Sequence, residues 1–330
     1  MTLQGRGFAQ AFMRRALRAG CTHLIIEVTS ESVLQSRHTF LNFDALLVTN
    51  IQKEHIESHG SFENYVAAKR AIVDALARSS KNNRVLVANE DVPETQKFLS
   101  APVTKAIGFS FKELQDVSSD ARSTRFTYAD THFSLPLPGT FNALNALASI
   151  KLAGAFGIST AVASDALSTL PVVRGRVEHI DAGQDFLAVI DYAHTPDSLR
   201  ALYTAFGNKR KICVLGNTGG GRDTWKRPEM ANIAEECCDE VILTNEDPYD
   251  EDPQKIVQEM ARGMKKPPLI VMDRREAIRH ALTSARTGDA VLISGKGTDP
   301  YIMGAHGTKT PWNDAEVVRE ELHKLLAKSA

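Results

Sequence analysis

The sequence predicts an α/β protein in which mostly parallel sheets are covered by helices. Short apolar runs alternate with helical patterns along the chain, which is the order expected of strand–helix–strand units. Several runs are continuously apolar, as in parallel strands that are buried on both faces. The length of 330 residues suits about two domains of roughly 150 residues each. The candidate strands are residues 23–28, 45–50, 84–89, 106–111, 186–192, 211–216, 240–245, 269–272 and 290–295.

The order of elements changes between the two groups of strands. Residues 112–139 are polar and then rich in proline, and the stretch FTYADTHFSLPLPG predicts antiparallel strands or a loop. A helical pattern follows over residues 142–159. The next stretch, LPVVRGRVEHIDAG, combines proline with glycines and is typical of a junction. We therefore predict one domain over residues 1–174 and a second over residues 175–330.

Composition narrows the class of protein. The chain is 43% hydrophobic and 24% charged with a formal net charge of −1, so nothing indicates nucleic acid or an anionic membrane as a partner. No apolar run approaches the roughly 20 residues of a membrane helix, and the N-terminal stretch lacks the apolar core of a signal peptide. None of the four cysteines forms a CxxC pair, so we expect reduced, structural cysteines and a cytoplasmic location.

A lysine occupies the apolar face of one predicted helix. In HIESHGSFENYVAAK, Ser61 is a plausible N-cap, and Lys69 falls within the apolar stripe that follows. Glu27 ends one predicted strand and His55 follows the next. These residues could be a capping carboxylate, a loop histidine and a lysine whose ammonium reaches the surface. Alternatively, Glu27 and His55 bind a divalent cation near nucleotide phosphates, and burial keeps Lys69 neutral, so that it can add carbon dioxide to form a carbamate ligand.

Two glycine-rich stretches fail as phosphate-binding loops. GNTGGGRDTW has two glycines at the spacing of G-x-x-x-x-G-K-[ST], but Arg222 and Asp223 replace the lysine and the hydroxyl residue. GKG at residues 295–297 lacks the upstream part of that motif. The glycines still predict a tight turn after a strand, with Arg222, Lys226 and Arg227 either near an anionic ligand or simply solvated.

Seven motifs together carry a family resemblance. VTNIQKEHIESHGSFENYVAAK, LPGTFNALNALAS, RGRVEHI, IDYAHTPDSL, LGNTGGGRDTWKRPEMA, TNEDPYDEDP and ISGKGTDP occur in the order expected of a Mur ligase. The chain resembles this family, most closely its UDP-N-acetylmuramoyl-tripeptide synthetase (MurE) type, from just after the family's P-loop onward. The resemblance therefore implies an N-terminally truncated version of the family's central ATPase domain, which is mostly parallel, followed by a Rossmann-like C-terminal domain.

The resemblance implies an ATP-dependent amide ligase of peptidoglycan precursor synthesis. Such an enzyme joins a free amino acid to UDP-N-acetylmuramoyl-dipeptide through an acyl phosphate, and uses ATP, Mg²⁺ and a carbamylated lysine. By resemblance, the catalytic and magnesium-binding positions are Glu27, His55 and the carbamylated Lys69. The positions implied to hold the UDP-linked substrate are Ser30, Gln35 and Arg37.

The resemblance also assigns residues in the second half of the chain. The positions implied to bind ATP are Asn142, Asn145, Arg176, Asp191, Tyr192 and His194. The positions implied to bind the incoming amino acid are Asp247, Pro248, Gly295 and Asp299.

Three motifs depart from the family pattern. Asp-Asn-Pro-Arg, usual in diaminopimelate-adding enzymes, is Glu-Asp-Pro-Tyr at residues 246–249; GKGHE is GKGTD, and EVSSH is EVTSE. The acidic text at residues 246–252 would suit a cationic acceptor side chain such as lysine or ornithine. A folylpolyglutamate synthase-like ligase and a truncated, non-catalytic module that binds nucleotide or amino acid are the alternatives, the latter because the sequence contains no convincing P-loop.

Overall fold

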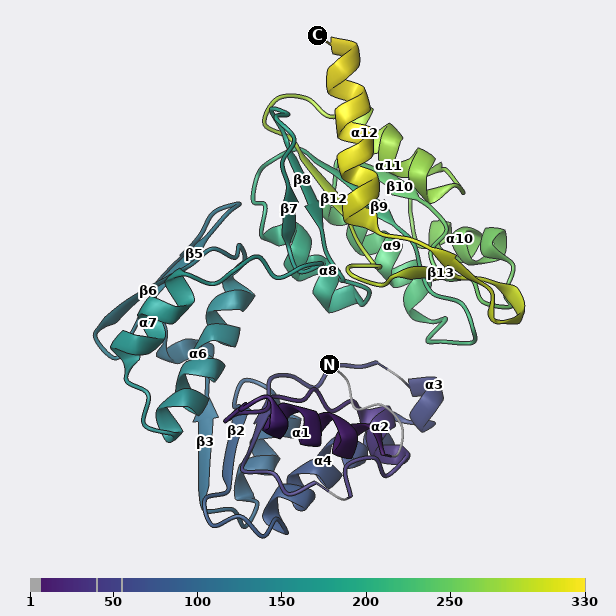
Figure 1. Ribbon diagram of the computed structural model, residues 1–330. Helices are drawn as coiled ribbons and strands as arrows, with labels where there is room; N and C mark the ends of the chain where they lie inside the picture. Colours follow the sequence, from purple (N-terminus) through teal and green to yellow (C-terminus); the bar gives the residue numbers. More distant parts are fainter. Residues whose placement is uncertain (1–6, 40, 55, 330) are drawn as a thin grey trace. The chain divides into compact units, whose positions relative to one another are not determined.

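A computed structural model describes residues 7–39, 41–54 and 56–329, and its elements are labelled in Figure 1. The chain divides into two compact units. Unit 1 contains the described residues of Met1–Gln115 and Leu144–Ala163, and unit 2 contains those of Asp116–Ala143 and Ser164–Ala330. No helix among the described residues is long and apolar enough to cross a membrane.

Unit 1 is built on a parallel sheet of three strands in the order β1-β2-β3. The central strand β2 is buried at every position, which explains why its sequence is a continuous apolar run. Helix α4 packs Tyr65, Val73 and Leu76 into the same core as Leu86 of β2. The elements are α1 (Phe8–Arg18), α2 (Ser30–Leu34), β1 (Ala45–Val48), α3 (Ile56–His59), α4 (Phe62–Ala77), β2 (Val85–Asn89), α5 (Pro93–Gln96), η1 (Lys97–Ser100), β3 (Lys105–Phe109) and η2 (Phe111–Glu113).

The strand predicted over residues 23–28 is wrong. Only Glu27 makes a single bridge there, and the Ile25 side chain is 92% exposed. An apolar run forms a buried strand only where neighbouring strands and helices cover it, and the described sheet of unit 1 begins at β1. The apolar residues of this run predicted a buried strand, but no neighbouring strand or helix among the described residues covers Ile25.

The polar, proline-rich segment forms the antiparallel sheet that its sequence predicts. Strands β4 (Gln115–Ser119), β5 (Thr124–Tyr128) and β6 (Thr131–Leu135) pair in that order, and β5 faces β6 from Thr124 opposite Leu135 to Tyr128 opposite Thr131. Helices α6 (Thr140–Ala155) and α7 (Thr160–Ser168) follow.

Unit 2 contains a six-stranded sheet in the order β11-β10-β9-β12-β8-β7. All its neighbouring strands are parallel except β7, which runs antiparallel to β8. The strands are β7 (Glu178–Ile180), β8 (Leu187–Ile190), β9 (Lys211–Leu215), β10 (Glu240–Leu243), β11 (Leu269–Ile270) and β12 (Ala290–Ile293). The other elements are α8 (Pro196–Thr204), α9 (Lys226–Cys237), α10 (Pro253–Ala261), α11 (Arg274–Ser284), β13 (Tyr301–Met303), η3 (Ala305–Gly307), β14 (Lys309–Pro311) and α12 (Asp314–Ser329).

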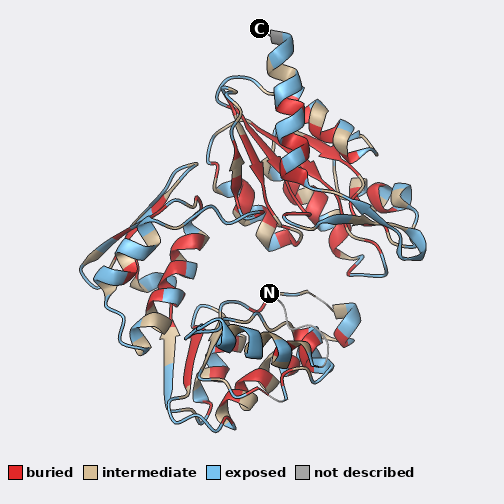
Figure 2. Ribbon diagram, viewed as in Figure 1, coloured by how far each residue is buried: buried red, intermediate tan, exposed pale blue. Residues whose placement is uncertain are grey.

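Helices bury both faces of this sheet. Cys213 and Leu215 of β9 share one core with α8, α9 and α10, whereas Ile212 and Val214 share the other with α11 and α12. Successive side chains of a strand point to opposite faces, so each strand needs apolar residues at every position. The continuous red of the central strands in Figure 2 shows this burial. The parallel pairing of these strands confirms the prediction of a parallel sheet.

Two of the four cysteines contradict the expectation of reduced thiols. Cys213 and Cys238 form a disulfide, whereas Cys21 and Cys237 are free. Cys213 lies within β9 and Cys238 directly follows α9. The packing of α9 against β9 brings together two residues 25 positions apart, a proximity that sequence spacing does not reveal.

Glu321 on α12 predicts a pH-dependent contribution to stability. Its carboxylate accepts hydrogen bonds from Arg279, Lys324 and Arg275, which lower its pKa from 4.5 to about 2. A lowered pKa stabilises the fold above the unfolded value of 4.5, and this contribution disappears as the pH falls through about 2. Glu321→Gln should lower the unfolding free energy by roughly 1–3 kcal/mol at pH 7 and by progressively less in acid, as urea unfolding will measure. The exposed Glu316 on the same helix provides a control; an equal effect of Glu316→Gln would contradict the prediction.

Candidate functional site

Lys69 lies in the position that its sequence pattern predicts. Helix α4 begins after Ser61, whose side chain accepts a hydrogen bond from the Asn64 N–H at 3.2 Å, so the predicted N-cap is confirmed. Tyr65 and Val73 of the same helix are buried. Lys69 itself is half-buried, and its Nζ lies 5.6 Å from the centre of the Tyr65 ring.

Two carboxylates act on the Lys69 ammonium. Burial lowers the pKa of Lys69, and the negative charges of Glu54 and Glu27 oppose that effect. Glu54 also accepts a hydrogen bond from the Tyr65 hydroxyl at 3.1 Å. Glu54 and Glu27 are thus the carboxylates whose charge acts on Lys69. Sequence reasoning assigned Glu27 and missed Glu54. His55 lies outside the described residues.

The donor atoms around Lys69 fit a hard cation. Carboxylate oxygens are ligands that Mg²⁺ prefers, and a lowered lysine pKa increases the fraction of neutral amine, the form that adds carbon dioxide. Across residues 7–39, 41–54 and 56–329, no group of three or more His, Cys, Asp or Glu residues is arranged to hold a metal ion. The described part therefore supplies carboxylate ligands but not a complete set.

The three residues assigned to the UDP-linked substrate lie on or after α2. Ser30 is buried, and its hydroxyl is 3.0 Å from Nε2 of His59, so His59 supports Ser30. Arg37 donates a hydrogen bond to the exposed Gln35.

Two of the residues assigned to ATP lie three positions apart on α6. The buried Asn142 donates to the carbonyl of Pro138 at 2.8 Å, whereas Asn145 is exposed. Residues three apart share one helix face, so the two amides project from the same side of α6.

The remaining ATP residues meet at the carboxyl end of β8. Asp191 accepts the N–H groups of Val177 at 2.8 Å and Ala193 at 2.7 Å, while its burial raises its pKa. The guanidinium of Arg176 lies 4.7 Å from the Tyr192 ring centre, and the rings of Tyr192 and His194 are 4.8 Å apart. Burial, followed by the charges of Asp299 and Glu246, raises the pKa of Tyr192 to about 12. This end of the sheet therefore joins the ATP residues to the amino-acid residues.

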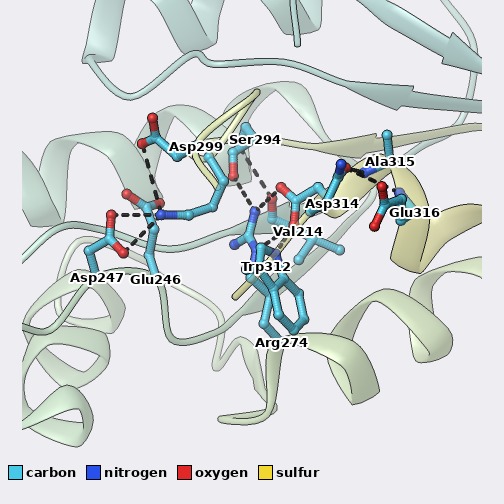
Figure 3. Close-up of polar contacts among 12 residues, drawn as sticks. Val214, Glu246, Asp247, Arg274, Ser294, Asp299, Trp312, Asp314, Ala315 and Glu316 are labelled. Atoms are coloured by element: carbon cyan, nitrogen blue, oxygen red, sulfur yellow. Dashed lines mark hydrogen bonds and ion pairs between the residues drawn. The ribbon is translucent and has the colours of Figure 1, made fainter. Parts of the chain in front are cut away.

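The residues assigned to the amino acid follow β10 and β12 and lie together. Lys296 donates to both oxygens of Asp247 at 2.8 Å, and its ammonium is 3.8 Å from the Asp299 carboxylate. Figure 3 shows Glu246, Asp247 and Asp299 grouped beside Arg274. Sequence reasoning gave Lys296 no role, although the family resemblance assigned Gly295 and Asp299 on either side of it.

A buried ion pair lies next to this group. Arg274 donates to the two oxygens of Asp314 at 2.9 and 2.7 Å and to the Ser294 carbonyl at 2.9 Å (Figure 3). Trp312 also donates to Asp314, at 2.7 Å. Sequence reasoning missed this pair. The sequence shows only that a charged residue begins each of the helices α11 and α12.

The glycine-rich turn is less basic than its sequence suggests. Arg227 is buried and pairs with Glu259 at 2.6 Å and Glu251 at 2.9 Å, so the interpretation that it faces an anionic ligand is wrong. Arg222 is exposed, with its guanidinium 5.3 Å from the Tyr249 ring centre. Two carboxylates of the acidic stretch at residues 246–252 are already paired within the protein. Lys296 binds Asp247, and Arg227 binds Glu251.

Comparisons with known proteins match both halves of the chain. Residues 8–153 match the Mur ligase middle domain, and residues 175–297 match the Mur ligase glutamate ligase domain. A UDP-N-acetylmuramoyl-L-alanyl-D-glutamate–2,6-diaminopimelate ligase of Syntrophomonas wolfei is 35% identical over 88% of this chain and 62% of its own length. A UDP-N-acetylmuramyl-tripeptide synthetase of Roseiflexus sp. is 35% identical over 96% of this chain and 67% of its own length.

Solved structures agree with these matches. A UDP-N-acetylmuramoyl-L-alanyl-D-glutamate–2,6-diaminopimelate ligase superposes with a TM-score of 0.60 and 26% identity, over 96% of this chain and 68% of its own. The fold is shared by MurF ligase from Thermotoga maritima in complex with ADP, with a TM-score of 0.69 and 19% identity, over 100% of this chain and 74% of its own.

These matches cover nearly all of this chain but only about two thirds of each relative. The chain spans between 62% and 67% of the length of the relatives from Syntrophomonas and Roseiflexus. Two domain matches in the family's order, 35% identity to relatives and a shared fold agree with one another. By descent and by fold, the chain belongs to the Mur ligase family.

Proposed function

We propose that the protein is an ATP-dependent amide ligase that adds an amino acid, preferably a diamino acid, to UDP-N-acetylmuramoyl-dipeptide in peptidoglycan precursor synthesis. The observation that carries the proposal is the 35% identity to a diaminopimelate ligase over 88% of this chain. The gathering of Arg176, Tyr192, Asp247 and Asp299 at one edge of a parallel sheet supports it, because ligands of such sheets bind beyond the carboxyl ends of the strands.

In the proposed reaction, a carboxylate of the UDP-linked substrate attacks the γ-phosphate of ATP, ADP leaves, and the carboxylate becomes an acyl phosphate. The amine of the acceptor then displaces phosphate and forms the amide. Glu27, His55 and a carbamylated Lys69 would hold Mg²⁺, which neutralises phosphate charge when bound. Arg176 offers an exposed guanidinium to ATP, while the buried Asp191 orients the backbone of Val177 and Ala193 next to it.

The acceptor would bind at the carboxyl ends of β10 and β12. The Asp299 carboxylate, exposed by 43%, can accept an ammonium group, while Asp247, Pro248 and Gly295 shape the backbone around it. We also propose the domain boundary between residues 174 and 175, and a cytoplasmic location, where ATP is supplied.

The test is phosphate release by the full-length product of the gene that encodes this chain. We expect release to require ATP, Mg²⁺, UDP-N-acetylmuramoyl-L-alanyl-D-glutamate and one acceptor from a panel of meso-diaminopimelate, L-lysine and L-ornithine. Omitting the acceptor and replacing the dipeptide substrate with UDP-N-acetylmuramate are the controls. Release that continues without an acceptor, or that none of the three amino acids stimulates, would count against the ligase.

A further inference from the structure

The GKG sequence at residues 295–297 has a structural reason other than phosphate binding. Gly295 has φ +104°, and a Cβ there would overlap the carboxylate of Glu246. Gly297 has φ +50°, and a Cβ there would lie 2.8 Å from Cβ of Tyr192. Residues with a side chain rarely adopt a backbone with such positive φ angles, so positions 295 and 297, on both sides of Lys296, favour glycine. The two glycines let the chain turn tightly and direct Lys296 into the protein.

Lys296 is a buried cation shared between two carboxylates. Its side chain is 1% exposed, its Nζ is 2.8 Å from each oxygen of Asp247, and the nearest Asp299 oxygen is 3.8 Å away. Asp247 also accepts the N–H of Met303 at 2.8 Å. The Lys296–Asp247 pair thus ties together the turns that follow β10 and β12, and the Asp247 carboxylate also holds the strand β13.

The charges in this cluster do not balance. Glu246 lies beside the Lys296–Asp247 pair; one of its oxygens accepts a hydrogen bond from Thr218 at 2.9 Å, and the other has no partner among the described residues. Burial raises the pKa of both Glu246 and Asp299; Arg274 and then Lys296 oppose this for Glu246, and Lys296 opposes it for Asp299. Three carboxylates therefore surround Lys296.

The neighbouring cations do not remove this deficit. Arg274 donates its carboxylate hydrogen bonds to Asp314, and its charge lowers the pKa of Glu246 without outweighing burial. Arg222 and Arg176 lower the pKa of Asp299 from the exposed rim of the cluster, but burial still outweighs them. A ligand that brings an ammonium group would supply the missing positive charge.

We propose that Lys296 is a positioning residue for the acceptor amino acid. It fixes Asp247 through two hydrogen bonds and only partly neutralises Asp299, which leaves the Asp299 carboxylate oriented to receive an ammonium group of the acceptor. This inference rests on the proposed function, because it deepens the assignment of the amino-acid site.

The test compares Lys296→Met and Lys296→Arg with the unchanged chain by isothermal titration calorimetry. The probes are L-lysine and meso-diaminopimelate, each titrated between pH 6 and pH 8. Lys296→Met should weaken binding about tenfold or more, and its affinity should rise with pH, because a carboxyl group left without its cation takes up a proton that the ammonium must displace. Lys296→Arg should restore both the affinity and the flatter pH profile, since it keeps the positive charge.

Lys211 provides a matched control for the loss of a buried lysine. Its ammonium is also buried in unit 2, but it donates to the carbonyls of Gly207 and Lys209 rather than to carboxylates. Lys211→Met should leave the acceptor affinity and its pH profile unchanged. Asp247→Asn is the second variant should Lys296→Met fail to fold: releasing Lys296 to pair with Asp299 should also weaken acceptor binding about tenfold.

The outcomes separate the two proposals. If the unchanged chain binds a probe and both Lys296→Met and Asp247→Asn bind it equally well, the positioning role is overturned and the amino-acid site stands. If Lys296→Arg binds as poorly as Lys296→Met, the charge is not what matters, and the inference is again overturned. If the unchanged chain binds neither probe, the amino-acid site of the proposed function fails and the inference fails with it.

Discussion

Replacing Asp314 with alanine should lower the free energy of unfolding by about 3–5 kcal/mol. Asp314 is fully buried, and the partner guanidinium of Arg274 is 2% exposed. Their two hydrogen bonds are 2.9 and 2.7 Å long. Removing one member leaves the other charged group buried without compensation, and this costs far more than the pair itself contributes.

Chemical denaturation of the single and double variants will measure this effect. Arg274→Met should be similarly destabilising, whereas Arg274→Met combined with Asp314→Leu should cost less than the sum of the single changes, because no charge remains unpaired. Glu236→Ala is the matched control. Its pair with Arg200 is 2.7 Å long but about half exposed, so its loss should destabilise the fold much less than the loss of Asp314. Additive single changes would contradict a coupled buried pair.

This ion pair also supports the candidate site. Arg274 donates to the carbonyl of Ser294, which immediately precedes Gly295, and the Ser294 hydroxyl donates to Val214 at 3.2 Å. Arg274, whose charge Asp314 neutralises, thus also holds the turn that carries Lys296 by its hydrogen bond to Ser294. We therefore expect variants at Asp314 to disturb the proposed amino-acid site even where they still fold.

The strands of unit 2 could be predicted because their burial is symmetrical. β9, β10 and β12 have helices on both faces, so each is a continuous apolar run that differs clearly from the surrounding text. Strand β7 was not predicted, since its three residues, Glu178–Ile180, are too few to show a pattern. Residues 23–28 have the same apolar character without the same covering, and there the prediction of a strand is wrong.

The site could be predicted only where its residues follow strands. Asp191, Asp247 and Gly295 directly follow β8, β10 or β12 or lie within four residues of those strands, and the sheet brings them to one edge. The partners of these residues could not be predicted, because Lys296 and Asp247 are 49 positions apart and nothing local distinguishes a paired carboxylate from a free one. The Cys213–Cys238 disulfide escaped prediction for the same reason.

Lys69→Ala should reduce turnover of the full-length protein by more than the roughly 100-fold that loss of an outer-shell partner of a metal site costs. Lys69 is half-buried on α4, and burial lowers its pKa, which increases the neutral amine that can add carbon dioxide. A signal independent of turnover is available: ¹³C-bicarbonate should give a carbamate resonance in the unchanged protein, stronger at higher pH, and none in the variant. Lys81→Ala, at an exposed lysine 3.3 Å from Asp44, should retain both the signal and the activity. Bicarbonate should not rescue Lys69→Ala, because no amine remains to carry the carboxylate, and an undiminished carbamate signal in that variant would place the adduct on another lysine.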